Sequence, residues 1–447
     1  MPEPIPILIT GGTVLDGTGT PPRPDTPVLL EGDRITAVGP ETVSSAPEVS
    51  GAGSDVRVID ATGCTVMPGL IDAHVHCTFD DVQSNDELFF HRDHTLAALI
   101  AARNLQKLLL AGVTGFCDPD TLFSMGPSLR DAIEAGVVEG PRMATGVQAL
   151  VTAVGGTAGR LIPDTGVVGY AQVVTTIDEM IQITRRHIKY GADWIKIHAT
   201  GSIPRHRGEL LAWKLEELKA VCETAHELET PVMAHARSAE STRACAEAGV
   251  DLILHASFMD DPALEAVVDA GAALMPTFTF LANLTDYGHL VGAGAGMKDV
   301  FRGEIEATAK MMARAHDAGV PLLCGSESGF ALTPYGHWHA REMQVLVESV
   351  GLSPVQAIAC ATANGAIALR MEGEVGALVP GMAADVLVVN GNPAADVTVL
   401  ADRSNLRQVI SRGRPVDLDR PWPTRAPIPG EKVANWAARS LTRDLLG

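Results

Sequence analysis

The chain has 447 residues, more than one ordinary domain needs, so a barrel of about 250 residues plus an accessory domain fits the length. Apolar residues make up 46% and charged residues 20%, which excludes a disordered chain. The net charge of -20 disfavours nucleic acid or an anionic membrane surface as a partner, because like charges repel. We therefore expect a small-molecule substrate, no nucleic acid and no membrane.

The seven cysteines are scattered singly and form no CxxC pair. This pattern is typical of buried thiols in a reducing compartment rather than of disulfides. The sequence lacks an N-terminal basic segment followed by a long apolar run, and no window reaches about 18 uncharged apolar residues. We expect a cytoplasmic protein without a signal peptide or a membrane span.

The first 65 residues alternate short apolar runs with Gly-Asp turns, which predicts β structure. From Pro68 the pattern changes to strands that alternate with helices, and eight parallel strands of this kind indicate a (β/α)8 barrel. The expected barrel strands are 70–76, 114–118, 143–148, 194–199, 231–236, 252–255, 273–280 and 322–326, and the expected helices are 91–111, 129–135, 177–190, 214–228, 239–248, 262–270 and 300–318.

After the barrel, residues 354–369 are expected to be helical, and strands return at 384–389 and 406–411. We predict that these late strands pair with the first ones. The fold class is then α/β: a TIM-like barrel at 68–378, a composite β-sandwich domain from 1–67 and 379–418, and a C-terminal extension at 419–447 with a last helix at 432–446.

The sharpest motif is Asp72-Ala73-His74-Val75-His76. Alternate residues of a strand share a face, so His74 and His76 are expected to point together into the mouth of the barrel. Two imidazoles at the carboxyl end of a barrel strand suit a divalent transition metal, although two histidines on a surface turn would read the same way.

Further candidates end later strands. His235 and His255 each close a predicted strand, where barrel enzymes place their chemistry. Lys196 lies mid-strand between two isoleucines that face the helices, so Lys196 and His198 are expected to face the barrel interior. Burial lowers the pKa of an unpaired lysine, and a neutral amine can take up carbon dioxide to form a carbamate that bridges two metals. A lysine paired with a carboxylate is the alternative.

These motifs resemble the amidohydrolase superfamily over nearly the whole chain. The segments 9–17, 68–76, 111–114, 191–196 and 376–385 are similar to its opening hairpin, metal signature, second and fourth strands and return to the β domain. The phrases nearest the site look most like the imidazolonepropionase/prolidase-like branch, and 329–336 more loosely resembles phenylurea and molinate hydrolases.

The resemblance implies one or two divalent metals, most simply zinc, that activate a hydroxide near neutral pH. It implies His74 and His76 as ligands of the more buried ion. His235 and His255 would bind the more exposed ion, and carboxylated Lys196 would bridge the two.

The family ends its eighth strand with an aspartate that is a ligand and proton shuttle, whereas this chain has Glu327. We hypothesise that Glu327 is the general base, so that Glu327, Lys196 and His255 form the catalytic set.

The reaction expected is hydrolysis of a C–N bond in an amide, urea or carbamate. Aminohydrolases of the superfamily usually carry a glutamate at the position of Ser238 and lack the strand-four lysine, so deamination is disfavoured. Seven of the 19 aromatic residues lie between 278 and 338, where composition alone predicts about 2–3. This clustering favours an apolar or aryl substrate. The candidate substrate-binding residues are His198, Phe278, Phe280, Phe330, Tyr335, His337 and Trp338.

Three alternatives stay open. A dipeptidase acting on Xaa-Pro or an N-acyl amino acid hydrolase would need a cation for the substrate carboxylate, and Arg205, Arg207 and Arg237 lie within reach of strands four and five. An inactive relative that serves as a scaffold is a reading of another class. Analogy with related barrels also leads us to expect a homo-oligomer.

Overall fold

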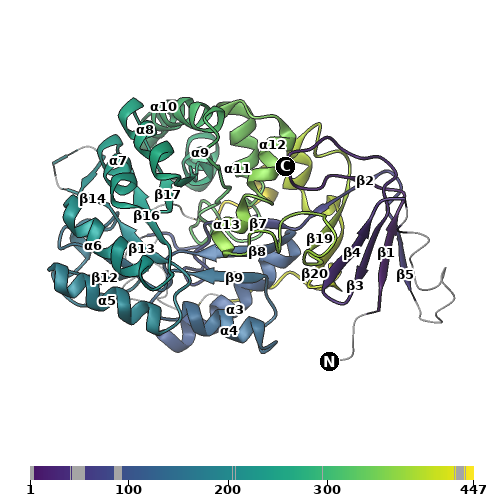
Figure 1. The fold of residues 1–447 in the computed structure, drawn as a ribbon, viewed down its shortest axis with the longest axis horizontal. Helices are drawn as coiled ribbons and strands as arrows, with labels where there is room; N and C mark the ends of the chain where they lie inside the picture. The colour runs from purple at the N-terminus through teal and green to yellow at the C-terminus, as the bar shows by residue number, and fades with distance from the viewer. Residues whose placement is uncertain are drawn as a thin grey trace.

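Figure 1 shows a large α/β body and, at one end, a smaller β region in which early and late parts of the chain meet. The computed structural model describes residues 5–40, 42, 56–84, 93–203, 205–206, 208–293, 295–426, 428, 437 and 439–446. Within these ranges, no helix is both long enough and apolar enough to cross a membrane.

Two sheets make up the small β region, with strand orders β4-β3-β1-β5 and β2-β6-β19-β20-β21. Val66 of β6 lies opposite Val388 of β19, so the expected pairing of early and late strands is present. Buried side chains of both sheets, among them Ile9, Ile35 and Ile410, belong to one apolar cluster. The strands are β1 Ile7–Thr10, β2 Thr13–Val14, β3 Val28–Glu31, β4 Arg34–Val38, β5 Arg57–Asp60, β6 Cys64–Pro68, β19 Val386–Asn390, β20 Leu406–Ser411 and β21 Arg414–Pro415.

The large region has a TIM-barrel-like α/β arrangement built on parallel sheets. One sheet has the order β7-β8-β9, and a second has the order β11-β12-β10-β13-β16-β17-β18. The strands are β7 Leu70–Asp72, β8 Val113–Asp118, β9 Arg142–Thr145, β10 Ala149–Val151, β11 Val167–Val168, β12 Ala171–Val173, β13 Ile195–His198, β16 Val232–Ala236, β17 Leu252–His255 and β18 Ala273–Met275.

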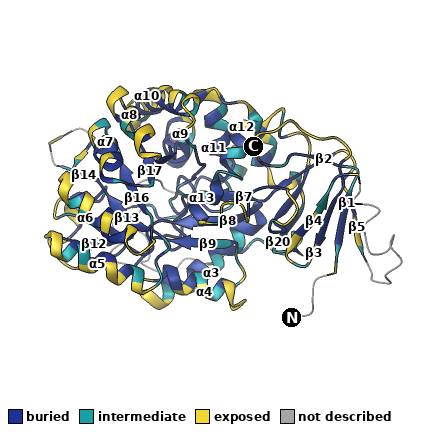
Figure 2. Ribbon diagram, viewed as in Figure 1, coloured by how far each residue is buried: buried dark blue, intermediate teal, exposed yellow. Residues whose placement is uncertain are grey.

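Helices follow most of these strands. Every residue of β13, β16 and β17 is buried, as Figure 2 shows, because a parallel sheet in such folds is covered on both faces. The helices are α3 His94–Leu110, α4 Gly126–Glu134, α5 Ile177–Lys189, α6 Leu215–His226, α7 Ala239–Ala248, α8 Asp261–Ala270, α9 Thr279–Tyr287, α10 Lys298–Asp317, α11 Arg341–Val345, α12 Pro354–Cys360 and α13 Gly365–Leu369. All seven cysteines are buried and unbridged, as expected.

The expected strand 273–280 is wrong in its second half. It ends at Met275, and α9 begins at Thr279, so Phe280 lies on a helix. The cause is a distant carboxylate: Glu342 accepts hydrogen bonds from the backbone N–H groups of Phe278 and Thr279, both at 2.8 Å. Those N–H groups would otherwise be unpaired at a helix start.

The segment 322–326 forms one isolated bridge, between Leu322 and Leu274, rather than a regular strand. It is still hydrogen-bonded to a chain segment on each side. Leu323 N donates to Leu274 O of β18, and Ala73 N, just after β7, donates to Cys324 O. The expected helix 354–369 is divided into α12 and α13. The expected helix 432–446 lies largely outside the described residues, and its described end is a 3-10 turn, Arg443–Leu446.

Candidate metal centre and catalytic cavity

A cavity of about 780 Å³ opens where the parallel strands end. This volume suits a small organic ligand. All six residues expected to hold metal line it: His74, His76, Lys196, His235, His255 and Glu327.

The four histidines lie close to one another. Ring centroids are 4.9 Å apart for His74 and His76, 4.6 Å for His235 and His255, and 5.7 Å for His74 and His255. Donor atoms of His74, His76 and Glu327 lie within 4.8 Å of each other. The topology thus gathers residues separated by up to 253 positions, from 74 to 327, into one potential ligand set.

Buried carboxylates hold two of these rings. Nδ1 of His76 lies 2.9 Å from Oδ1 of Asp120, and Nε2 of His235 lies 2.6 Å from Oε2 of Glu209. A carboxylate that holds one ring nitrogen orients the other nitrogen toward a metal and increases its basicity. His76 would therefore present Nε2, and His235 would present Nδ1.

The other two rings also keep a nitrogen for a ligand. Nδ1 of His74 lies 3.2 Å from Oγ1 of Thr277. Nε2 of His255 is buried and has no hydrogen-bond partner among the described residues. Burial lowers the pKa of both histidines well below the usual range, so both are neutral, which is the form that binds a metal. This donor set fits a divalent cation such as zinc.

Lys196 lies at the base of the cavity with 1% of its surface exposed. Burial lowers the pKa of its ammonium group, and Oδ2 of Asp120 lies 4.0 Å from Nζ. That separation is at the limit of an ion pair, so both expected roles, a nucleophilic amine and a partner of a carboxylate, are compatible with the position.

Glu327 and His255 have left-handed backbones, with φ of 55° and 67°. This conformation is costly for residues other than glycine and is concentrated at functional sites. Glu327 N donates to His74 O at 2.8 Å, and burial raises the pKa of the Glu327 carboxyl group. Gly325 allows this approach, because a Cβ there would lie 2.6 Å from Cβ of His74.

Asp120 is a residue that the sequence reasoning missed. Besides His76, it contacts Nε2 of His198 at 3.0 Å. Burial opposes its ionisation, but His76 and Lys196 outweigh that cost and hold the pKa of Asp120 well below its usual range. Its neighbour Asp118 joins His76 and Asp120 in a second group with metal-ligand spacing, and burial raises the pKa of Asp118 to about 7. Their place at the end of β8 is the signal that could have found them.

Glu209 was missed for a different reason. It lies on a two-stranded hairpin, β14 Thr200–Ser202 and β15 Glu209–Leu211, that is inserted after β13 and does not follow the strand–helix pattern. Thr200 Oγ1 donates to the same carboxylate at 2.6 Å. Nothing in the spacing of the sequence indicates that this hairpin brings Glu209 to His235.

Of the seven expected substrate-binding residues, His198, Phe280 and Phe330 line the cavity. The other four are not among its lining residues. The Tyr335 hydroxyl donates to His76 O, and Trp338 Nε1 donates to Leu441 O at 2.6 Å. His337 accepts at Nδ1 from Arg443 N, and Phe278 is buried with its backbone on Glu342. The loop after residue 330 therefore packs against the C-terminal segment instead of forming the pocket.

Apolar side chains from α9, α10 and the loops after β14 and β17 form the outer wall. Phe258, Met297 and Val300 stay 43–57% exposed at this wall. The apolar lining consists of Phe79, Tyr170, Ile203, Phe258, Phe280, Leu281, Leu284, Met297, Val300, Phe301 and Phe330.

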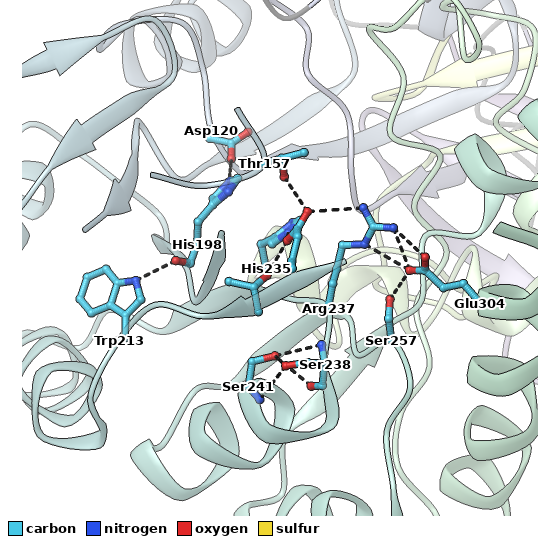
Figure 3. A network of polar contacts seen from close by, with 12 residues as sticks. Asp120, Thr157, His198, Trp213, His235, Arg237, Ser238, Ser241, Ser257 and Glu304 are labelled. Carbon is cyan, nitrogen blue, oxygen red and sulfur yellow. Dashed lines mark hydrogen bonds and ion pairs between the residues drawn. The ribbon is translucent and has the colours of Figure 1, made fainter. Parts of the chain in front are cut away.

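Arg237 and Glu304 contact each other directly, as Figure 3 shows. Arg237 lines the cavity, whereas the described lining does not include Arg205, and Arg207 lies outside the described residues. The surrounding carboxylates outweigh the effect of burial and raise the pKa of Arg237 above its usual value.

Comparisons with known proteins agree with this geometry. Residues 65–416, more than half of the chain, match the amidohydrolase family model. An ochratoxinase from Aspergillus niger is 27% identical over 433 residues, covering 91% of this chain and 86% of that protein. A prolidase solved with N-methylphosphonate-L-proline is 26% identical with a TM-score of 0.80, covering 92% of this chain and 99% of that one.

A molinate hydrolase structure, 23% identical with a TM-score of 0.76 over 96% of this chain and 99% of that one, shares the fold. An imidazolonepropionase also matches. The resemblance drawn from the motifs is therefore confirmed, and the chain belongs to the amidohydrolase family.

Proposed function

We propose that this protein is a metal-dependent hydrolase of a C–N bond in an amide, urea or carbamate whose substituents are apolar or aryl. The family membership and the relatives support hydrolysis of amides or ureas. The observation that carries the proposal is the convergence of four histidines, Lys196 and Glu327 on one apolar-walled cavity.

The residues of the cavity have different expected roles, depending on where they lie. His74, His76, His235 and His255 would hold one or two divalent ions, which supply Lewis acidity and lower the pKa of a coordinated water when bound. Glu327, whose pKa is raised by burial, is suited to take a proton from water and return it to the leaving nitrogen. The apolar wall is suited to pack against apolar or aryl substituents of the substrate.

We also propose that Lys196 is carboxylated. Its neutral Nζ adds to the carbon of carbon dioxide, a C–N bond forms, and one proton leaves to solvent. Burial favours the neutral amine that this step needs. Carbon-13 NMR of protein equilibrated with labelled bicarbonate is expected to show a carbamate signal that is absent from Lys196→Met.

The architecture supports a closed barrel. Thr145 O accepts from Trp194 N, next to β13, and residues 321–324 bond to β18 and to the chain just after β7. We interpret these bonds as closure of eight strands, and the shared core of the two end sheets as a β-sandwich.

The test combines metal analysis with a substrate panel. Purified protein is expected to hold one to two equivalents of divalent metal and to hydrolyse phenylureas, anilides or thiocarbamates. Activity should disappear with a chelator and return with zinc. Faster cleavage of Xaa-Pro dipeptides or N-acyl amino acids would favour the peptidase alternative. Metal well below one equivalent, with no turnover, would favour an inactive scaffold.

A further inference from the structure

The guanidinium group of Arg237 is the feature from which a substrate class can be argued. Among the described residues that line the cavity, two carry a lysine or arginine side chain, namely Lys196 and Arg237. Lys196 lies at the base, among the residues expected to hold metal. A substrate carboxylate held away from the scissile bond would therefore need Arg237.

Arg237 is already occupied. Its Nε and Nη2 donate to Glu304 Oε1 at 3.2 and 2.9 Å, and Nη2 also donates to Oε2 at 2.8 Å. Its Nη1 faces Glu209 Oε1 at 3.5 Å. Paired contacts of this kind are among the stronger and more specific ion pairs.

Glu304 is held in place independently of Arg237. Ser257 Oγ donates to its Oε1 at 2.7 Å, and the side chain is 5% exposed. Glu304 lies on the face of α10 that lines the cavity. If its carboxylate turned toward solvent, it would lose the contacts with Ser257 and Arg237.

The local charge follows from these contacts. One guanidinium faces two carboxylates, Glu304 and Glu209, so these three side chains together carry a net charge of about -1, not counting His235 or a bound metal ion. A substrate carboxylate placed here would lose its hydration and meet two like charges. The adjoining wall is apolar, and Phe301 lies under the guanidinium, 5.8 Å from Cζ to the ring centroid.

We propose that Glu304 is a specificity determinant that neutralises Arg237 and restricts the enzyme to substrates without a carboxylate beside the scissile C–N bond. The substrate class is then an uncharged amide, urea or carbamate with apolar substituents on both sides. This inference rests on the proposed function and argues against peptides with a free carboxyl end.

The experiment measures binding to the metal-loaded protein by calorimetry with a matched pair, N-benzoylglycine and its neutral amide. The wild-type protein is expected to bind the amide at least 10-fold more tightly than the carboxylate. Glu304→Gln removes the bidentate carboxylate partner of Arg237 and leaves Glu209 facing it, so we expect this preference to shift toward the carboxylate by about 10-fold, or 1.4 kcal/mol.

Glu306→Gln is the control, because Glu306 is exposed on the same helix and the substitution removes the same charge. The shift should be absent from Glu306→Gln and from the double variant Glu304→Gln/Arg237→Gln. Equal shifts in Glu304→Gln and Glu306→Gln would overturn the proposal. Should Glu304→Gln not fold, a wild-type protein that binds both ligands equally would overturn it as well.

Binding and turnover are separate readouts. If the protein prefers the amide but hydrolyses no substrate, the proposed function is wrong and the role of Glu304 in ligand preference still holds. Turnover of N-acyl amino acids at rates matching their amides would keep the hydrolase and remove this inference.

Discussion

The base of the cavity and its outer wall differ in how they are built. The base comes from strand ends: His235 and His255 lie at the carboxyl ends of β16 and β17, and His74 follows the last residue of β7 by two positions. The wall comes from a hairpin and two helices that have no such repeat, and it contributes Glu209, Phe280 and Glu304. The base is equipped for chemistry common to a family, whereas the wall is where this chain's own substrate choice is expected.

The largest expected effect is at the base. Glu327→Gln keeps the shape of the side chain and removes the base, so kcat should fall by about 100- to 10,000-fold. Metal content should stay within twofold of wild type if proton transfer is the main loss. The measurement is steady-state kinetics beside elemental analysis.

Glu327→Asp gives a second readout, since a site built around the longer side chain should lose turnover while fold and metal are kept. Unchanged activity in Glu327→Ala would show that another residue is the base.

A smaller effect is expected one layer out from the metal ligands. Asp120→Asn and Glu209→Gln should each weaken zinc binding by about 10- to 100-fold, because each removes a charge that orients a histidine. The measurement is competition with a zinc chelator. Asp120→Asn should lose more, because Asp120 contacts His198 and lies near Lys196 as well.

Glu216→Gln, an exposed change on α6, should leave zinc affinity unchanged. If all three variants bind zinc like wild type, the two carboxylates only pack the fold.

At the wall, Phe258→Ala should raise KM for an aryl substrate by about 3- to 10-fold, the loss expected for about 1 kcal/mol of apolar contact, with kcat unchanged. Phe258 is 46% exposed, so folding should be little affected. Val137→Ala is the matched surface control, since Val137 is 79% exposed and does not line the cavity. A fall in kcat at constant KM would place Phe258 in the chemistry rather than in binding.

The last effect lies away from both regions and concerns stability rather than catalysis or binding. His187 of α5 is buried, neither ring nitrogen has a partner among the described residues, and burial lowers its pKa to about 4. The unfolded chain binds this proton below about pH 6.5, whereas the folded chain does not until about pH 4. His187 therefore lowers stability as pH falls through that window, by roughly 3 kcal/mol at most.

Denaturant unfolding at pH 7 and pH 4.5 should show a smaller acid loss in His187→Phe than in wild type. An identical acid loss in both proteins would show that His187 does not contribute.

The sequence was sufficient for the base because strand ends determine where the ligands gather. The expected strand 70–76 ends early, at Asp72, but His74 and His76 follow it directly and line the cavity with Lys196 of β13. It was insufficient where long-range contacts decide. Glu342, far along the chain, accepts hydrogen bonds at the start of α9, where the sequence predicted a strand. Trp338 donates a hydrogen bond to Leu441 O in the C-terminal segment and does not line the cavity. Clustering of aromatics between 278 and 338 thus identified Phe280, Phe301 and Phe330, but also residues that pack elsewhere.

The pairing of early with late strands has a consequence for synthesis on the ribosome. Val66 of β6 finds Val388 of β19 only after more than 300 further residues have been translated. At roughly 5–20 residues per second the first strands wait for tens of seconds. During that time β1, β3 and β4 can form their own small sheet, but its apolar face stays uncovered. A newly made chain is thus expected to need protection by chaperones longest at its beginning.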